Sequence, residues 1–197
     1  MSARLDHLER VEVASTQELR AWLAANHACG QSVWLVTGKK QAGAGYIPYA
    51  AIVEELLCYG WIDSLPRALD ATRAMLLISP RKPGSAWSKD NRERIARLEA
   101  EGRMAAPGRA VVEAARADGA WERLMATESG KAPTDLAEAL AEAGALMGWE
   151  GLSLSVRRRS LELLLAAKRP DTRAARIARI VTAAREGKDP TAWRPKV

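Results

Sequence analysis

The sequence predicts an α+β fold, in which a small three-stranded β-α-β-β unit in the N-terminal half is covered by a predominantly helical C-terminal half. Two observations predict this fold. Runs of β-branched and aromatic residues that suit strands occur only within the first 80 residues. After Pro80, every periodic segment has the spacing of an amphipathic helix. The 197-residue chain is long enough to bury a hydrophobic core without disulfides or metals.

Capping residues and apolar periodicity predict the elements of the first 80 residues in order. Ser15 and Glu18 form a capping box, in which each side chain satisfies a free backbone N–H at the start of a helix. Gly30 supplies the left-handed residue that ends this helix, and Gly60 ends a second helix with an apolar face. The predicted elements are helices from the Ser15 cap to Gly30 and from Tyr49 to Gly60, and strands over 32–37, 61–69 and 74–79.

The rest of the chain predicts helices only. Pro80 and Pro83 break the last strand, and Asp90 with Glu93 forms a second capping box. Helices are predicted from Asp90 to Gly102 and over 107–118, 121–127, 134–143, 155–168 and 171–186. Since the connections are short, we predict one domain over 1–197, comprising a mixed α/β part (1–80), a helical part (81–187) and an extended tail (188–197).

The charge is concentrated near the C-terminus. The net charge is +6, yet residues 150–197 hold 12 Lys/Arg against 5 Asp/Glu, which leaves residues 1–149 nearly neutral. A basic protein with a pI near 9.6 is a candidate for nucleic-acid binding. The arginines of this surface would be Arg157, Arg158, Arg159, Arg176 and Arg179. A solvated basic face is the more common explanation, so a nucleic-acid partner is the second interpretation.

Several other classes of protein are disfavoured. No stretch approaches the roughly 18 uninterrupted apolar residues of a membrane span, and the N-terminal segment has no apolar run, so a cytoplasmic location is expected. Cys29 and Cys58 form no CxxC pair, and only His7 and His27 accompany them. We therefore predict neither a metal site nor a cofactor, and the sequence leaves the oligomeric state open.

A loop rich in hydrogen-bond donors precedes the helix predicted from Asp90. Arg81, Ser85, Trp87, Ser88 and Asn91 lie on a loop shaped by proline and glycine that leads to a helix N-terminus. Backbone N–H groups at such a terminus attract anions, and an arginine adds a bidentate partner for phosphate or carboxylate. The alternative is local capping by the serines and asparagine, with the indole anchoring the loop to the core.

Three further residues complete the predicted site. On a strand that begins at Trp61, Trp61 and Asp63 point to one face. Arg173 falls on the inward face of the last helix and therefore needs a partner, for which Asp63 or a bound anion is a candidate. The alternatives are that Trp61 fills the core edge and Asp63 pairs with an internal arginine. A third interpretation is an enzyme in which Asp63 acts as a general base, which requires a substrate-sized cleft in front of it.

Three segments resemble the YdeI/OmpD-associated family, which is named for bacteriocin protection. They are EELLCYGWIDS at 54–64, SPRKPGSAWSKDN at 79–91 and AKRPDTR at 167–173, where Asp171 replaces the family's usual glutamate. Their order and spacing extend the resemblance from about residue 15 to 187. The resemblance implies a protein without established catalytic activity, associated with envelope stress, antimicrobial-peptide tolerance and an outer-membrane porin.

These observations together predict a non-catalytic, basic stress-response protein. It would bind a small anionic ligand or polyanionic partner through Trp61, Asp63, Arg81, Ser85, Trp87, Ser88, Asn91 and Arg173. The protective role is implied by the resemblance alone.

Overall fold

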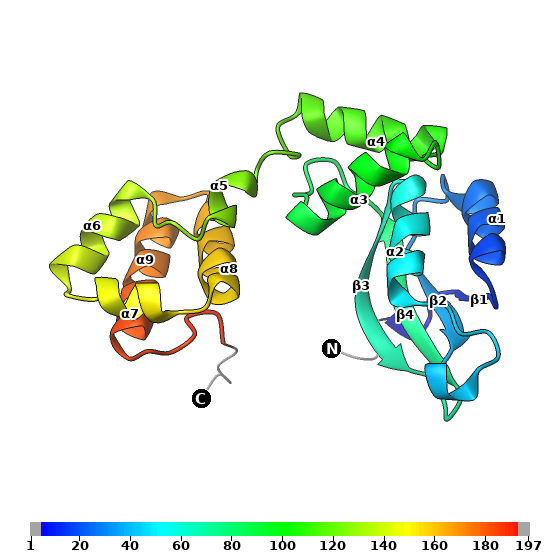
Figure 1. The fold of residues 1–197 in the computed structure, drawn as a ribbon, viewed down its shortest axis with the longest axis horizontal. Helices are drawn as coiled ribbons and strands as arrows, with labels where there is room; N and C mark the ends of the chain where they lie inside the picture. The colour runs from blue at the N-terminus through cyan, green and yellow to red at the C-terminus, as the bar shows by residue number, and fades with distance from the viewer. Residues whose placement is uncertain (1–4, 193–197) are drawn as a thin grey trace. The chain divides into compact units, whose positions relative to one another are not determined.

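The computed structural model describes residues 5–192 and confirms the α+β prediction (Figure 1). The chain divides into two compact units, an N-terminal unit (Met1–Arg123) and a C-terminal unit (Leu124–Val197). The mixed and helical parts were expected to meet at residue 80, but this position lies inside the N-terminal unit. That the whole chain forms one domain stays a prediction. The predicted tail over 188–197 lies partly outside the described residues.

The N-terminal unit contains a four-stranded sheet in the order β1-β2-β4-β3, one strand more than expected. The strands β2 and β1 are parallel, and the other pairs are antiparallel. Their bounds are β1 Arg10–Glu12, β2 Val33–Gly38, β3 Trp61–Ala68 and β4 Arg73–Pro80. The predicted strands correspond to β2, β3 and β4. The sequence did not reveal β1, because three residues with one central valine are too short to show alternation.

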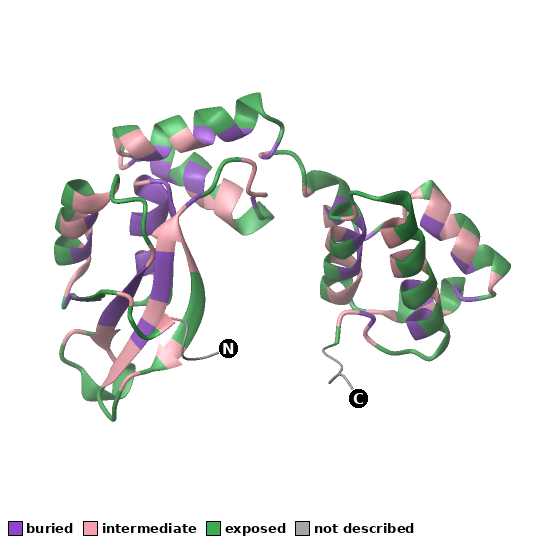
Figure 2. Cartoon of the chain, turned by 180° about the vertical axis from the view of Figure 1, so that it is seen from behind, coloured by how far each residue is buried: buried purple, intermediate pink, exposed green. Residues whose placement is uncertain are grey.

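The helices of the N-terminal unit form two layers, of which the first packs directly on this sheet. The helices are α1 Thr16–Asn26, α2 Tyr49–Cys58, α3 Lys89–Ala100 and α4 Ala106–Ala117, with a 3₁₀ turn at Lys40–Ala42. Helix α2 is buried on both sides (Figure 2). Ile52 and Leu56 pack on the sheet with α1, whereas Val53 and Leu57 pack on α3 and α4. The second helical layer is therefore held to the sheet through α2.

A single turn joins α2 to the edge strand β3. Gly60 ends α2, as the sequence predicted, and it has a φ of 75° in the left-handed region that favours glycine. Its carbonyl accepts a hydrogen bond from the Arg81 backbone N–H at 2.9 Å. Because Trp61 pairs with Pro80 in the β3–β4 register, the chain leaves the sheet at Arg81, directly beside the end of α2. This junction positions the candidate site.

The C-terminal unit is entirely helical in its described part. Its helices are α5 Met125–Glu128, α6 Thr134–Glu142, α7 Leu146–Gly151, α8 Leu154–Leu165 and α9 Pro170–Arg185. Its core includes Leu136, Leu140, Trp149, Leu161 and Ile180. Helix α7 was not predicted, and the helix expected over 121–127 is reduced to α5. Across residues 5–192, no helix combines the length and the apolar character needed to cross a membrane.

Candidate functional site

Arg81 is the most unusual charged residue of the N-terminal unit. It follows β4 directly, and its side chain is folded inward, so that the residue is only 7% exposed. The Nη2 group donates a hydrogen bond to the backbone carbonyl of Ala86 at 2.7 Å. The Nε and Nη1 groups are buried and have no hydrogen-bond partner among the described residues. Buried donors of this kind are rare, since leaving one unsatisfied costs about 1–3 kcal/mol.

An aromatic stack fixes the position of this guanidinium. The guanidinium carbon Cζ of Arg81 lies 3.7 Å from the ring centroid of Trp87, and Trp87 is fully buried. The ring of Trp121 lies 5.1 Å from that of Trp87 on a tilted plane. Arg116 of α4 in turn lies over Trp121 at 4.8 Å. The stack holds Arg81 by cation–π attraction and leaves its in-plane donors for another partner.

A small cavity of about 80 Å³ lies beside Arg81. It is lined by the loop 81–85, by Trp87 and by residues of α4 and its C-terminal end: Arg81, Lys82, Pro83, Gly84, Ser85, Trp87, Val111, Ala114, Ala115 and Asp118. Two cations and one carboxylate therefore face it. The Asp118 carboxylate already accepts a hydrogen bond from the Ala120 N–H at 2.8 Å. The cavity keeps a net positive charge, and Arg81, with its two unpaired donors, is part of its wall.

Burial sets the electrostatics of the site. Removal from water lowers the pKa of Arg81 to about 10, so the guanidinium stays protonated at neutral pH. No carboxylate forms an ion pair with it among the described residues, and a buried cation without a counter-ion is unfavourable. An anion in the cavity would supply both the missing charge and the missing acceptors. The arrangement is thus chemically suited to hold a small anion.

Two predicted residues of the sheet lie outside this cavity. Trp61 is fully buried, donates from Nε1 to the His27 carbonyl at 3.2 Å, and meets Trp22 edge-on at 5.5 Å. Asp63 accepts a hydrogen bond from the Tyr49 hydroxyl at 2.7 Å, and this bond raises the pKa of Tyr49 to about 12. Trp61 therefore acts as the core residue that was weighed as the alternative, and Asp63 pairs with a tyrosine rather than with an arginine.

The predicted serines and asparagine are used locally. The Ser85 hydroxyl lines the cavity but donates to the Lys82 carbonyl at 2.6 Å. Ser88 caps α3 by accepting from the Asn91 backbone N–H at 3.3 Å, and the side-chain Oδ1 of Asn91 accepts from Arg94 at 3.2 Å. Ser88 and Asn91 do not line the cavity. Ser88 and Asn91 therefore serve in local capping at the start of α3, and the N-terminus of α3 is not part of the site.

The expected role of Arg173 needs correction. It lies in the C-terminal unit, where its Nε and Nη2 bind the two oxygens of Asp135 at 2.6 and 3.0 Å. This guanidinium lowers the pKa of Asp135. The prediction that Arg173 needs a partner is right, but the partner is neither Asp63 nor an anion. Of the eight predicted residues, the structure brings Arg81, Ser85 and Trp87 together.

Many C-terminal arginines also have internal partners. Arg158 donates to the Glu128 carbonyl at 2.7 Å, and Arg159 binds Asp189 at 2.8 Å. Arg176 donates to the Leu163 carbonyl, and Arg179 donates to a backbone carbonyl near the described C-terminus. These bonds tie helix ends together, so they give the basic residues a structural use that does not require a polyanion.

Sequence reasoning missed the α4 side of the cavity. Asp118 lies 37 positions after Arg81 in the chain, and only the packing of α4 against α2 brings the two together. Lys82 lies in the motif at 79–91 and directly follows Arg81, but the predicted site did not include it. Lys82 could have been predicted because it is adjacent to Arg81 and has the same charge. No local sequence pattern indicates Asp118.

Two family models match the chain, one on each side of the boundary between the two compact units. The model of a domain of unknown function (DUF8412) matches residues 11–111, which contain the motifs at 54–64 and 79–91. The model described as bacteriocin-protection, YdeI or OmpD-associated matches residues 130–187, which contain the motif at 167–173. The predicted resemblance is thus confirmed for the C-terminal part. Searches of curated proteins and of solved structures found no match.

Proposed function

We propose that this chain, which belongs to the DUF8412 family and carries a C-terminal segment of the YdeI or OmpD-associated family, binds a small anion at Arg81. One observation carries the proposal: two buried N–H groups of the Arg81 guanidinium have no hydrogen-bond partner among residues 5–192, and Arg81 is one of the residues that line a cavity. A carboxylate or phosphate oxygen is the acceptor that matches them best. The proposed function is binding rather than catalysis.

The cavity limits the size of the anion. At about 30 Å³ per liquid water, 80 Å³ corresponds to between two and three waters. This room suits a carboxylate group or one edge of a phosphate, while the rest of the ligand extends outward past Lys82. A whole nucleotide would not fit inside. Because Arg81 covers one face of Trp87 and Trp121 lies near its ring, a ligand ring has no free indole face on which to stack.

The protective role is a further part of the proposal. The family description of the C-terminal segment names bacteriocin protection. We propose that the anion is the signal or cargo through which the N-terminal unit contributes to protection. This step relies on the family description and is tested separately, by comparing bacteriocin survival of cells that carry the wild type or a variant without the anion site.

Thermal unfolding in different salts tests the anion site. Phosphate, sulfate and acetate would be compared with chloride at equal ionic strength, for the wild type and for Arg81→Met. An anion at one hundred times its Kd stabilises by about 2.7 kcal/mol, or roughly 5–10 °C for a chain of this size. We expect this shift for the wild type with phosphate or a carboxylate, and its loss in Arg81→Met.

A second arginine provides a matched control. Arg67 also lies over an indole, at 4.6 Å from Trp34, but it binds Asp6 and so has its own counter-ion. Arg67→Met should keep the anion response. If all three proteins respond equally, the anion binds elsewhere and the proposal is wrong. If the wild type responds to no anion, ordered water satisfies Arg81 and the proposal is also wrong.

A further inference from the structure

The C-terminal unit contains a second cavity, which differs from the first in size and chemistry. Its volume is about 300 Å³, at the lower end of the range of small-molecule sites. The α5–α6 segment and α8 form most of its wall, and α9 adds one residue. Its lining residues are Ala126, Thr127, Ser129, Lys131, Ala132, Pro133, Leu161, Leu164, Leu165 and Arg173.

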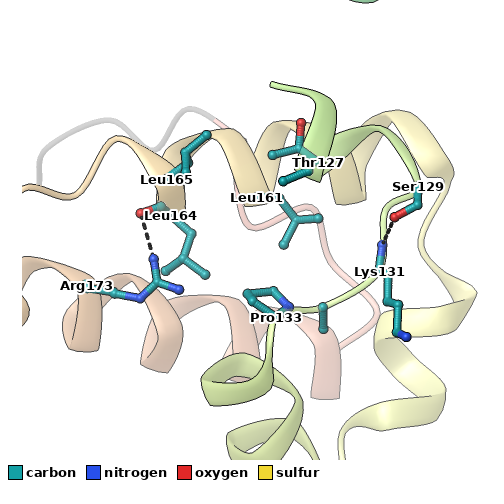
Figure 3. A pocket seen from close by; sticks show the side chains of 10 residues that line it. Thr127, Ser129, Lys131, Pro133, Leu161, Leu164, Leu165 and Arg173 are labelled. Carbon is teal, nitrogen blue, oxygen red and sulfur yellow. Dashed lines mark hydrogen bonds between the residues drawn. The ribbon is translucent and has the colours of Figure 1, made fainter. Parts of the chain in front are cut away.

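The middle of this cavity is apolar. In Figure 3, Leu161, Leu164 and Pro133 lie between Arg173 at one end and Lys131 at the other. Leu161 and Leu164 are buried in the core, whereas Leu165 is 41% exposed although it lines the same cavity. An apolar ligand that covered this surface would gain hydrophobic energy in proportion to the area removed from water.

The polar groups around the apolar wall are already satisfied. The Thr127 hydroxyl donates to the Leu124 carbonyl at 2.7 Å. The Ser129 hydroxyl oxygen accepts from the Lys131 backbone N–H at 3.2 Å, and Arg173 is held by Asp135. Each of these three side chains already has a protein partner, so few polar groups among the described residues are left for the hydroxyls of a sugar or the edge of a base. The walls select an apolar body.

One charged group at the cavity has no such partner. The ammonium of Lys131 makes no hydrogen bond or ion pair with any residue that the structure describes, and the residue is exposed. Its flexible four-carbon stem allows the charge to move to an anion at the cavity mouth. The site thus combines an apolar wall with a single available cation at its rim.

We propose that this cavity binds a single-chain amphiphile with one anionic head, of the class of medium-chain fatty acids. The apolar chain would lie over Leu161, Leu164 and Pro133, and the carboxylate would face Lys131. At about 30 Å³ for each water-sized atom, 300 Å³ holds about ten non-hydrogen atoms, which is the size of octanoate. This proposal does not depend on anion binding at Arg81.

A titration of the full-length chain with octanoate tests the site by calorimetry and amide NMR. Octanoate should bind with one site per chain and shift the amide resonances of Thr127, Ser129 and Leu165. Butyrate, with four fewer methylenes, should bind at least about tenfold more weakly. Octyltrimethylammonium has a tail of similar length and the opposite charge, and should bind several-fold more weakly than octanoate.

Variants separate the two parts of the site. Ala126 is exposed, so Ala126→Phe can fill the cavity from outside and should abolish octanoate binding. Lys131→Gln should weaken octanoate binding several-fold and should strengthen, or at least not weaken, binding of the cationic amphiphile. Lys168→Gln, an exposed lysine outside the cavity, is the control.

Three outcomes would overturn the proposal: octanoate does not bind, Ala126→Phe binds it as the wild type does, or both amphiphiles bind equally. If Ala126→Phe fails to fold, the proposal is tested by the octanoate affinity of Lys131→Gln and by the difference in affinity between the two amphiphiles. The phosphate response at Arg81 should be unchanged in all these variants, so failure here is distinguishable from failure of the anion site.

Discussion

Arg81 and Arg103 show two opposite electrostatic environments for an arginine side chain. Arg103 lies between Glu54 and Glu55 and contacts both carboxylates, which raise its pKa. Arg81 has no such carboxylate, and burial lowers its pKa instead. The fold therefore bears the cost of a buried cation at Arg81 and gains from the ion pairs at Arg103.

This contrast predicts the stability of Arg81→Met in the absence of anions. Methionine keeps the apolar contact with Trp87 and removes a buried charge, so the free energy of unfolding should be unchanged or higher by about 1 kcal/mol. Urea unfolding in chloride buffer measures it. A loss of more than about 2 kcal/mol would mean that Arg81 is a structural residue, and would count against its role in binding.

The ion pair of Arg173 with Asp135 should make the stability of the C-terminal unit depend on pH in the acid range. Arg173 lowers the pKa of Asp135 in the folded state below its ordinary value of 3.8. This pair therefore contributes stability above about pH 4, and the contribution is lost as the pH falls through the folded pKa. Its size is modest, because both side chains are partly exposed.

The variant Asp135→Asn should be less stable than the wild type at pH 7 and should approach it near pH 2. Unfolding followed by tryptophan fluorescence, through Trp149 in the core of this unit, measures the difference. A constant difference across this pH range would show that Asp135 acts through its shape or its N-terminal position in α6, and not through the charge pair.

At the scale of elements, both units use a helical glycine to bring two helices close together. A Cβ added at Gly108 of α4 would lie 2.1 Å from the carbonyl oxygen of Cys58 at the end of α2. A Cβ at Gly148 of α7 would lie 2.0 Å from the carbonyl oxygen of Ala184 in α9. In each case the obstacle is backbone, which cannot rotate away as a side chain can.

Helix α7 offers a matched pair that tests this packing. Gly148→Ala should destabilise the C-terminal unit by about 2 kcal/mol or more, because α7 must move away from α9. Gly151→Ala, in the same helix and with open space at its Cβ, should be neutral or slightly stabilising. Thermal unfolding of the two variants measures this. Equal stabilities would show that α7 and α9 are not in close contact in solution.

The elements also show which patterns are sufficient for prediction. The capping box at Ser15 acts locally, and the structure contains it. The capping box predicted at Asp90 and Glu93 is wrong, because α3 begins at Lys89 and Ser88 caps it. The left-handed Gly60 is local as well. By contrast, β1 has three residues and exists through its pairing with β2, and α7 has six residues held by packing. Elements that depend on distant contacts have little signature of their own.

At the scale of the whole molecule, the division into two units agrees with the family boundaries. The two family models end and begin on either side of residues 112–129, and the compact units meet within this interval. The core of the C-terminal unit contains Leu136, Trp149 and Ile180, and each of these lies beyond the boundary. The sequence did not predict the boundary, because short connections and similar helical patterns continue through it.

Hydrogen exchange on the full-length Gly148→Ala variant tests whether the units are energetically separate. If each unit is stabilised by its own core, amide exchange should rise in α7, α8 and α9 and remain unchanged in the sheet of the N-terminal unit. Exchange that rises equally in both parts would instead support the prediction of a single domain over 1–197.

The site was predicted less well than the fold, for a physical reason that applies to the whole molecule. Sequence spacing identified Arg81 and Trp87 because they are adjacent on one loop. It placed Arg173 in the same pocket, although Asp135 in its own unit satisfies its charge. It missed Asp118, which tertiary packing alone brings to the cavity. Local chemistry can be inferred from a motif, whereas the partners of a charge depend on the complete fold.

Arginine side-chain NMR would observe directly whether the unpaired donors of Arg81 bind an anion. With Arg81→Met used to assign the resonance, the Arg81 Nε–H signal of the wild type should move saturably with phosphate or acetate and remain unchanged with chloride. The Nε–H signal of Arg67 should not move. An Arg81 signal that stays constant across all these titrations would contradict the account.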